Sequence, residues 1–343
     1  MKLARNANTR ANAGRILCFA VFIGICLTSS YNTIIGLQCL VNAIAVLGLV
    51  LVSGYTRQIH LGQAAFIGLG AYTSGILMTK AGMDFWPTII ISILVSMAAG
   101  VLLGIPTLRM REGPYLAMVT QIFGEIIYVL LLNMEEITGG SFGMTGFASP
   151  EIAGHVFRTK KELLLITAVF FVLCFFVAMR ITKSKYGRFF LSIRESQDAA
   201  LSVGINTTKY KLTAFAICSG FGGLAGVFYT QCYGYLSPEQ FRWSISLNLI
   251  SMAIIGGIGS LEGGVIGAIV LTFLPEVLRG FSAQWRMITY GVLVILVLAF
   301  LPDGVISLIG KKPSEITRML KERTELLFTD ERAKRKKALK IRG

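Results

Sequence analysis

Long apolar runs separated by short polar segments dominate the sequence. A helix needs about 20 apolar residues to cross about 30 Å of hydrocarbon, and about ten runs approach that length. They cover residues 16–31, 34–54, 62–80, 86–108, 113–133, 163–181, 212–234, 246–258, 263–279 and 286–301. Hydrophobic residues make up 54% of the chain and charged residues 15%, which excludes a soluble globular enzyme. The sequence therefore predicts an all-α polytopic membrane protein with about ten transmembrane or re-entrant helices.

The lysine and arginine residues predict the orientation, because they are enriched on the cytoplasmic side of membrane proteins. If the N-terminus is inside and the runs alternate, 26 of the 33 basic residues fall inside and 7 outside. Both termini and the polar segment 182–211 are then cytoplasmic, and the segment 134–162 is external. The predicted organisation is a cytoplasmic N-terminus (1–15), a transmembrane domain (16–310) and a basic cytoplasmic tail (311–343).

The excess of positive charge and the N-terminus each allow a second interpretation. A net charge of +15 would indicate nucleic acid binding in a soluble chain. Here the basic residues lie between and beyond the apolar runs, so anionic lipid is the expected contact of the tail and no nucleic acid partner is expected. The basic start and the apolar segment 16–27 are also typical of a signal peptide. We favour an uncleaved first span, because the ten runs then alternate across the membrane and leave both termini on the cytoplasmic side.

The segment 182–211 is the longest internal polar interruption, and its pattern predicts an amphipathic helix at the membrane surface. Apolar residues fall on one side at helical spacing, and polar residues fall opposite. The apolar side holds Phe189, Phe190, Ile193, Ala200 and Leu201, and the polar side holds Arg194, Glu195, Asp198 and Ser202. Gly204 is expected to end the helix, and Asn206 or Thr207 to cap the next one. The alternative is a solvated linker between two spans.

Two glycine-rich stretches, Leu61–Gly75 and Ile254–Ala268, fall in the third and eighth of the ten runs. They are expected to be broken or re-entrant, and interrupted helices at matching positions indicate a substrate path. Glu125 stands in the middle of its run, where a carboxylate is costly. It could line the path, relay a proton or make a structural hydrogen bond. The residues assigned to the translocation path are Gln63, Gly70, Gln121, Glu125, Gly257 and Gly259.

Glycines four residues apart predict close contacts between helices. The pairs are Gly100 with Gly104, Gly222 with Gly226, and Gly263 with Gly267. In a membrane such spacing lets two helix backbones approach closely.

Motifs for catalysis, nucleotides and metals are missing from the sequence. The nearest approach to a phosphate-binding loop, at 304–312, has the wrong spacing, so any ATP must bind to another subunit. All six cysteines lie in apolar runs, and they are expected to be buried rather than metal ligands. His60 and His155 are the two histidines and are expected on opposite sides of the membrane, so a membrane enzyme is disfavoured.

The chain resembles the LivM-type permease subunits of bacterial branched-chain amino-acid ABC importers, from about Asn42 to Gly310. Short motifs whose order and spacing together are specific carry this resemblance. They are Gly54-Tyr55, Leu61-Gly62-Gln63-Ala64-Ala65-Phe66, Gly68-Leu69-Gly70-Ala71-Tyr72, Phe123-Gly124-Glu125-Ile126, Thr138-Gly139-Gly140, Gly143-Met144-Thr145-Gly146, Tyr186-Gly187-Arg188, Ile193-Arg194-Glu195, Gly204-Ile205-Asn206, Ser237-Pro238-Glu239, Gly256-Gly257-Ile258-Gly259-Ser260 and Leu274-Pro275-Glu276. The chain departs from the family pattern at Arg57 and His60, where the family usually has glycine and serine.

The resemblance implies an importer subunit in the bacterial inner membrane, without cofactors or catalytic residues of its own. Its partners would be a second permease of LivH type, two cytoplasmic ATP-binding subunits and an extracytoplasmic substrate-binding protein. The residues Asp198-Ala199-Ala200 and Gly204 resemble the EAA-type signature, with Asp in place of Glu, that docks on an ATPase. The implied coupling residues are Arg194, Glu195, Asp198, Ala199, Ala200 and Gly204. Two alternatives stay open: a permease for urea, amides or another small polar solute, and a secondary transporter coupled to protons through Glu125.

Overall fold

The computed structural model describes residues 19, 21–107, 114–152, 154–280, 282–301 and 304–308. The helices are α2 (Ser30–Leu49), α3 (Gln63–Thr79), α4 (Phe85–Thr107), α5 (Pro114–Asn133), α6 (Glu135–Thr138), α7 (Lys160–Lys183), α8 (Lys185–Glu195), α9 (Gln197–Ser202), α10 (Thr207–Tyr233), α11 (Trp243–Gly256), α12 (Leu261–Val277) and α13 (Ala283–Phe300). A helical segment over 21–27 precedes α2. Two short antiparallel ladders pair β1 (Met144–Thr145) with β4 (Tyr235–Leu236), and β2 (Glu151–Ile152) with β3 (His155–Val156).

Within the described part of the chain, six helical segments are long and apolar enough to cross a membrane. They are Ser30–Gly54, Phe85–Thr107, Tyr115–Asn133, Lys160–Lys183, Thr207–Tyr233 and Leu261–Gly280. The prediction of an all-α polytopic membrane protein is therefore confirmed. The count of about ten membrane elements and the orientation of the termini stay predictions. The predicted N-terminal segment 1–15 and basic tail 311–343 lie outside the described residues.

The expected interruption of the third element is wrong, because α3 is one continuous helix from Gln63 to Thr79. The glycines of α3 serve packing instead, since a Cβ at Gly70 would overlap the backbone of Gly223 on α10. The interruption expected near residue 257 is present. Helix α11 ends at Gly256, and the chain turns over 257–260 before α12 begins. Gly257, with φ 117°, supplies a backbone conformation that other residues rarely adopt.

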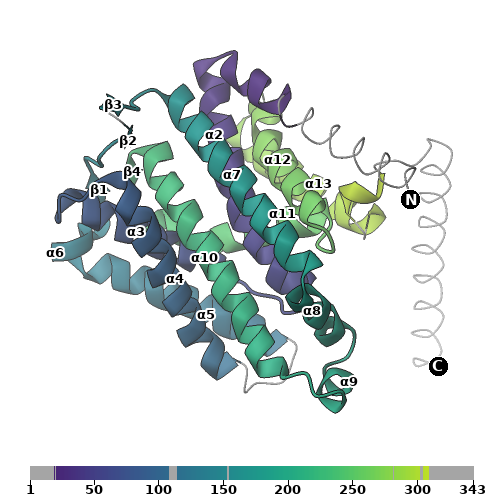
Figure 1. The fold of residues 1–343 in the computed structure, drawn as a ribbon. Coiled ribbons are helices and arrows are strands. Elements are labelled where there is room, and N and C mark those ends of the chain that lie inside the picture. Colours follow the sequence, from purple (N-terminus) through teal and green to yellow (C-terminus); the bar gives the residue numbers. More distant parts are fainter. Residues whose placement is uncertain are drawn as a thin grey trace, which may run out of the picture.

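Helix α10 is the centre of the bundle and packs on α2, α3 and α4 (Figure 1). A Cβ at Gly226 would overlap the backbone of α3 at Ile67, and one at Gly100 of α4 would overlap the Ser219 side chain of α10. The pair Gly263 and Gly267 brings α12 against the backbone of α11 in the same way. The predicted helix-packing role of the spaced glycines is therefore confirmed, and small residues set these close crossings.

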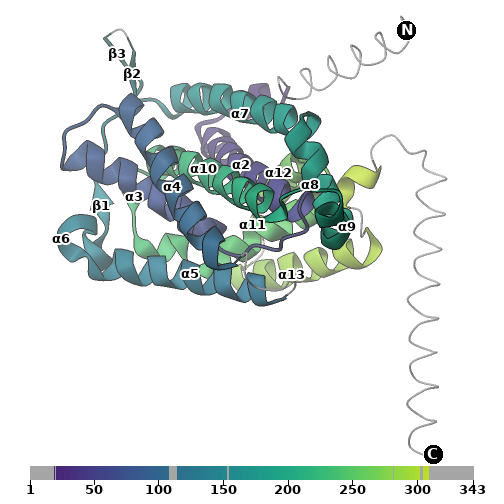
Figure 2. The same cartoon turned by 60° about the horizontal axis from the view of Figure 1, so that its bottom comes forward.

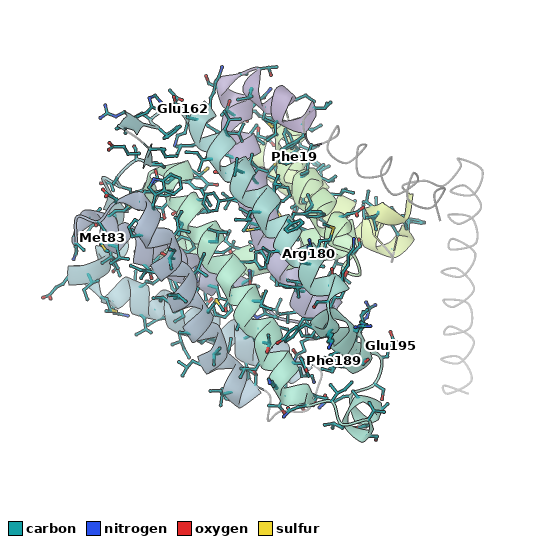
Figure 3. All side chains as sticks on the ribbon, viewed as in Figure 1. Phe19, Met83, Glu162, Arg180, Phe189 and Glu195 are labelled. Atoms are coloured by element: carbon teal, nitrogen blue, oxygen red, sulfur yellow. The ribbon has the colours of Figure 1, made fainter. Side chains whose placement is uncertain are left out.

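The bundle has two distinct ends, which we call the α8 end and the hairpin end. Figure 3 places Arg180, Phe189 and Glu195 at the α8 end, and Met83 and Glu162 at the opposite one. The hairpin end carries the ladders β1–β4 and β2–β3 (Figure 1). The view in Figure 2 shows α8 and α9 together at one corner, and α6 and β1 at the opposite side.

The hairpin end is braced by a sequence motif that occurs twice, Pro-Glu-x-x-Arg at 238–242 and at 275–279. In the first copy, the Tyr128 hydroxyl of α5 donates to Glu239 at 2.6 Å, and the Arg242 guanidinium lies 5.3 Å from the Tyr128 ring centre. In the second copy, Tyr31 of α2 donates to Glu276, and Arg279 lies over the Tyr31 ring at 4.6 Å. The first copy thus connects α5 to the segment that follows α10, and the second connects α2 to the end of α12.

Candidate coupling surface and translocation path

The polar segment 182–211 forms two helices, α8 and α9, rather than the single helix predicted. Ser196 is extended, with φ −159° and ψ 117°, and its hydroxyl accepts from the Ala199 amide at 3.3 Å. A serine hydroxyl that accepts from the amide three residues ahead starts a new helix and competes with continuation of the preceding one. Helix α8 therefore stops at Glu195 and α9 begins after Ser196. The break rotates the following residues, and Leu201, expected on the apolar side, is exposed.

Apolar and polar contacts anchor this segment to α10. Phe190 and Ile193 of α8 are buried, and so is Ala200 of α9. The Phe189 ring lies 4.7 Å from the Tyr210 ring, and the Lys211 ammonium donates to Gln197 Oε1 at 2.5 Å. The segment is therefore an ordered platform on the bundle, which excludes the alternative of a solvated linker.

The outward side of the platform carries the residues that the resemblance implied for coupling. Glu195, Asp198, Ala199, Leu201 and Val203 are all exposed, whereas Ala200 points into the bundle. Gly204 has φ 82° and ends α9. The Asn206 side chain accepts from the Lys209 amide at 3.0 Å and caps α10. Both terminal signals were predicted correctly. Because α9 lies at the extremity of the bundle (Figure 1), this side is open to a partner.

Arg194 does not point outward with its neighbours. Its Nη1 donates to the Gly54 carbonyl at 2.9 Å, where α2 ends in a π-helical turn. The guanidinium also lies 3.9 Å from where a Cβ on Gly259 would stand, in the turn between α11 and α12. Arg194 thus links α8 to the turn that follows α2 by a hydrogen bond, and it lies beside the turn between α11 and α12.

A cavity of about 450 Å³ lies beside this contact, lined by Ser53, Gly54, Arg57, Arg194, Glu195 and Ile258. Arg57 is the one non-glycine residue with a positive φ, 58°, among the described residues. Left-handed backbone costs an ordinary residue about 1–2 kcal/mol. A glycine at this position would adopt the conformation without strain. Sequence reasoning flagged the departure but could not supply the backbone angle.

Gln63, assigned to the path, is fully buried and makes several hydrogen bonds. Its Nε2 donates to the carbonyls of Ala45 (3.1 Å) and Cys218 (3.4 Å), and its Oε1 accepts from the Cys218 thiol at 3.1 Å. His60 Nε2 lies 3.3 Å from the same oxygen. Gln63 therefore ties α3 to α2 and α10 through the amide at its end.

Replacing Gln63 with leucine should destabilise the protein by about 1–3 kcal/mol, because buried partners lose their hydrogen bonds. The measurement is the melting temperature of the detergent-purified protein. Gln121→Leu is the matched control, since Gln121 lies half-buried beside an open groove, and its melting temperature should stay close to wild type. Equal melting of the Gln63 variant and wild type would contradict the structural role.

An open groove of about 550 Å³ runs along α5, the most exposed of the six spans, and contains both polar residues assigned to the path from that helix. It is lined by Met118, Gln121, Ile122, Glu125, Ile126, Val129 and Leu130. Only 22% of the residues in the apolar part of α5 are buried, whereas 83% are buried in the span that contains α2. Glu125 Oε1 is buried, and no hydrogen-bond partner for it lies among the described residues. A carboxylate in this position needs a donor or water, which lipid chains cannot supply.

The structure brings the predicted site residues into three separate places. Gln121 and Glu125 share the α5 groove, whereas Gln63 and Gly70 lie in the packed interface of α3 with α10. Gly257 and Gly259 lie in the turn after α11, and Gly259 is the one beside Arg194. Arg194 and Gly259 thus bring one coupling residue and one path residue together at the α8 end. Sequence reasoning missed that junction, and the proximity of Arg194 to the end of α2 left no sequence signal.

Comparison with known protein families gives one match that covers most of the chain. The family described as "Branched-chain amino acid transport system / permease component" matches residues 32–298. That family is one of transport permeases. No solved structure matches the chain.

Curated relatives agree with the family match. The chain is 35% identical to the high-affinity branched-chain amino acid transport system permease protein LivM of Salmonella typhimurium, over 76% of the chain and 66% of that protein. The LivM of Escherichia coli gives the same identity and coverage. The match therefore spans slightly less than two thirds of these relatives. The autoinducer 2 import system permease protein LsrC of Salmonella choleraesuis is 23% identical, over 89% of the chain and 88% of that protein.

Proposed function

The chain belongs to the family of permease components of branched-chain amino acid transport systems, and we propose that it is the LivM-type membrane subunit of an ABC importer. It is a multi-pass protein of the bacterial inner membrane. Its substrates are branched-chain amino acids, and its partners are a second permease of LivH type, two ATP-binding subunits and an extracytoplasmic binding protein. The chain has about ten membrane elements, with both termini and the α8 end in the cytoplasm.

The α8–α9 platform is the surface on which an ATP-binding subunit docks. This proposal is supported by one observation above all: α9 and its exposed residues directly follow α8, whose Arg194 donates a hydrogen bond to the Gly54 carbonyl after α2. Closure of the ATPases would displace α8, and Arg194 would carry the displacement to α2 and to the α11–α12 turn. Alternating access of this kind needs small rigid shifts of packed helices.

The translocation path runs along the α5 groove, between this chain and the second permease. Glu125 supports this choice, because its buried Oε1 lacks a described partner and lies among apolar residues. In this arrangement the second permease or water in the path satisfies the carboxylate. Gln121, one turn earlier, supplies a second polar group to the same wall.

Uptake measurements on the whole transporter in proteoliposomes test the function. Labelled leucine should accumulate only when the ATP-binding subunits hydrolyse ATP, and hydrolysis-deficient subunits should abolish accumulation. Glu125→Gln should retain uptake within about fivefold of wild type, because the amide keeps the side-chain length and one acceptor oxygen and needs no proton transfer. Glu151→Gln, an exposed carboxylate at the hairpin end, is the matched control.

The alternative of a proton-coupled carrier gives opposite results in the same vesicles. Uptake would persist without ATP hydrolysis, would follow an imposed proton gradient, and would be lost in Glu125→Gln. Accumulation of urea or amides in preference to leucine would instead assign the permease to the other solute class.

A further inference from the structure

One aromatic side chain at the hairpin end is almost completely exposed. Phe142 has 93% of its surface accessible, the highest value among the large apolar side chains of the described residues. It ends the turn Gly140–Phe142, which follows α5 and α6. A single exposed apolar residue on a mobile loop needs no explanation. The exposure of Phe142 indicates a binding role only if the backbone of its loop is fixed.

The loop backbone is held where only glycine fits. Gly139 has φ 74° and Gly143 has φ 72°. A Cβ at Gly139 would overlap the Gly143 carbonyl, and a Cβ at Gly143 would overlap the Leu236 carbonyl. The two glycines on either side of Phe142 therefore allow a tight turn pressed against the β4 backbone, which no larger residue permits.

Hydrogen bonds fix the same turn on both sides. The Thr138 hydroxyl donates to the Leu131 carbonyl at 2.6 Å and accepts from the Gly140 amide at 3.2 Å. The Tyr235 hydroxyl donates to the Phe142 carbonyl at 3.3 Å, and β1 pairs with β4 immediately afterwards. The turn is thus bonded to α5 and to β4, and the Phe142 side chain projects from a fixed point of the backbone.

The charges beside the turn favour a protein partner over a membrane. Glu135 and Glu136 are exposed on α6, and a Cβ on Gly140 would touch the Glu135 side chain. The Lys80 ammonium donates to the Glu136 carbonyl, so two carboxylates and one ammonium lie beside the turn and its local charge is negative. Carboxylates at this position are repelled by anionic lipid headgroups. An aromatic side chain on a fixed backbone is a common form of anchor that fills a pocket in another protein.

We propose that Phe142 is the anchor that docks the extracytoplasmic substrate-binding protein, inserting into an apolar pocket whose rim is basic. This inference rests on the proposed function, because it requires the hairpin end to face outward and the transporter to have such a partner. Basic residues at the pocket rim would match Glu135 and Glu136.

The test measures binding of the substrate-binding protein to the whole transporter in nanodiscs of zwitterionic lipid. Phe142→Ala should weaken binding at least about tenfold, and Phe142→Leu should recover part of the loss. Val277→Ala is the matched control, since Val277 is 77% exposed at the end of α12, and it should bind like wild type. The melting temperature should be the same in all variants.

Three results would overturn the anchor. They are wild-type affinity in Phe142→Ala, loss of the second permease from the purified Phe142→Ala complex, and a loss of affinity that appears only when anionic lipid is present. The last two would assign Phe142 to the second permease or to the membrane. Failure of the wild-type transporter to bind any substrate-binding protein would instead contradict the proposed function itself.

Discussion

Replacing Gly226 with alanine should remove most of the folded protein from the membrane. The added Cβ would overlap the Ile67 carbonyl and would lie 2.6 Å from the Ala71 amide nitrogen, both of them backbone atoms of α3. Backbone cannot rotate away as a side chain can, so α10 must separate from α3 along their contact. Overpacking a well-packed site costs about 1–3 kcal/mol, and a clash between two backbones at the centre of the bundle belongs at or above the top of that range.

Gly291→Ala is the matched control, because a Cβ at Gly291 of α13 meets no atom of the described residues within 4 Å. Alanine is favoured over glycine in a helix by about 1 kcal/mol, so this variant should be as stable as wild type or more stable. The measurements are the yield of monodisperse protein from membranes and its melting temperature. If Gly226→Ala melted at the wild-type temperature, the contact of α10 with α3 would not be as close as the structure has it.

Changing Glu195 and Asp198 together to lysine should reduce uptake to background while the protein stays folded. Both side chains are exposed on the α8–α9 platform. Exposed substitutions usually change stability by less than about 0.5 kcal/mol. Reversing two charges within a docking surface sets like charges against each other, which costs several kcal/mol of binding energy. The measurement is the amount of ATP-binding subunit that co-purifies with the variant, together with uptake in proteoliposomes.

Asp84→Lys with Glu151→Lys makes the same change in net charge at the hairpin end, where both residues are exposed. This control should retain the ATP-binding subunits, because it leaves the platform intact. Wild-type co-purification and uptake in the Glu195 and Asp198 double variant would remove the docking role from α9. Loss of the ATPases in both double variants would show an effect of net charge rather than of the platform.

Several features could be predicted from the sequence because they depend on local physics. The apolar runs fix the helices, since a backbone in lipid must satisfy its own hydrogen bonds. The spaced glycines of α4, α10 and α12 predict close crossings, because no other residue lets backbones meet. Gly204 and Asn206 act within a single turn of chain, so their capping roles needed no tertiary information.

Other features were decided by contacts between residues far apart in the chain. The same glycine that indicated a broken helix at Gly70 instead packs α3 on α10, because only the fold places Gly223 opposite it. Arg194 lies among polar residues at helical spacing, yet its direction is set by the Gly54 carbonyl, 140 residues away in sequence. Gln63 became a structural crosslink because α2 and α10 bring two carbonyls to it.

The sequence alone thus determined that this chain is a helical membrane permease, and where its apolar runs, helix ends and small-residue crossings lie. The permease family follows from the motifs that the chain shares with LivM-type subunits, whereas the other properties follow from residue chemistry within one or two helical turns. The tertiary structure decided which polar side chains face a partner, which face a groove and which are hydrogen-bonded inside the bundle. A side chain is assigned to one of these places by its neighbours, and the neighbours of a span are chosen by how all the helices pack together.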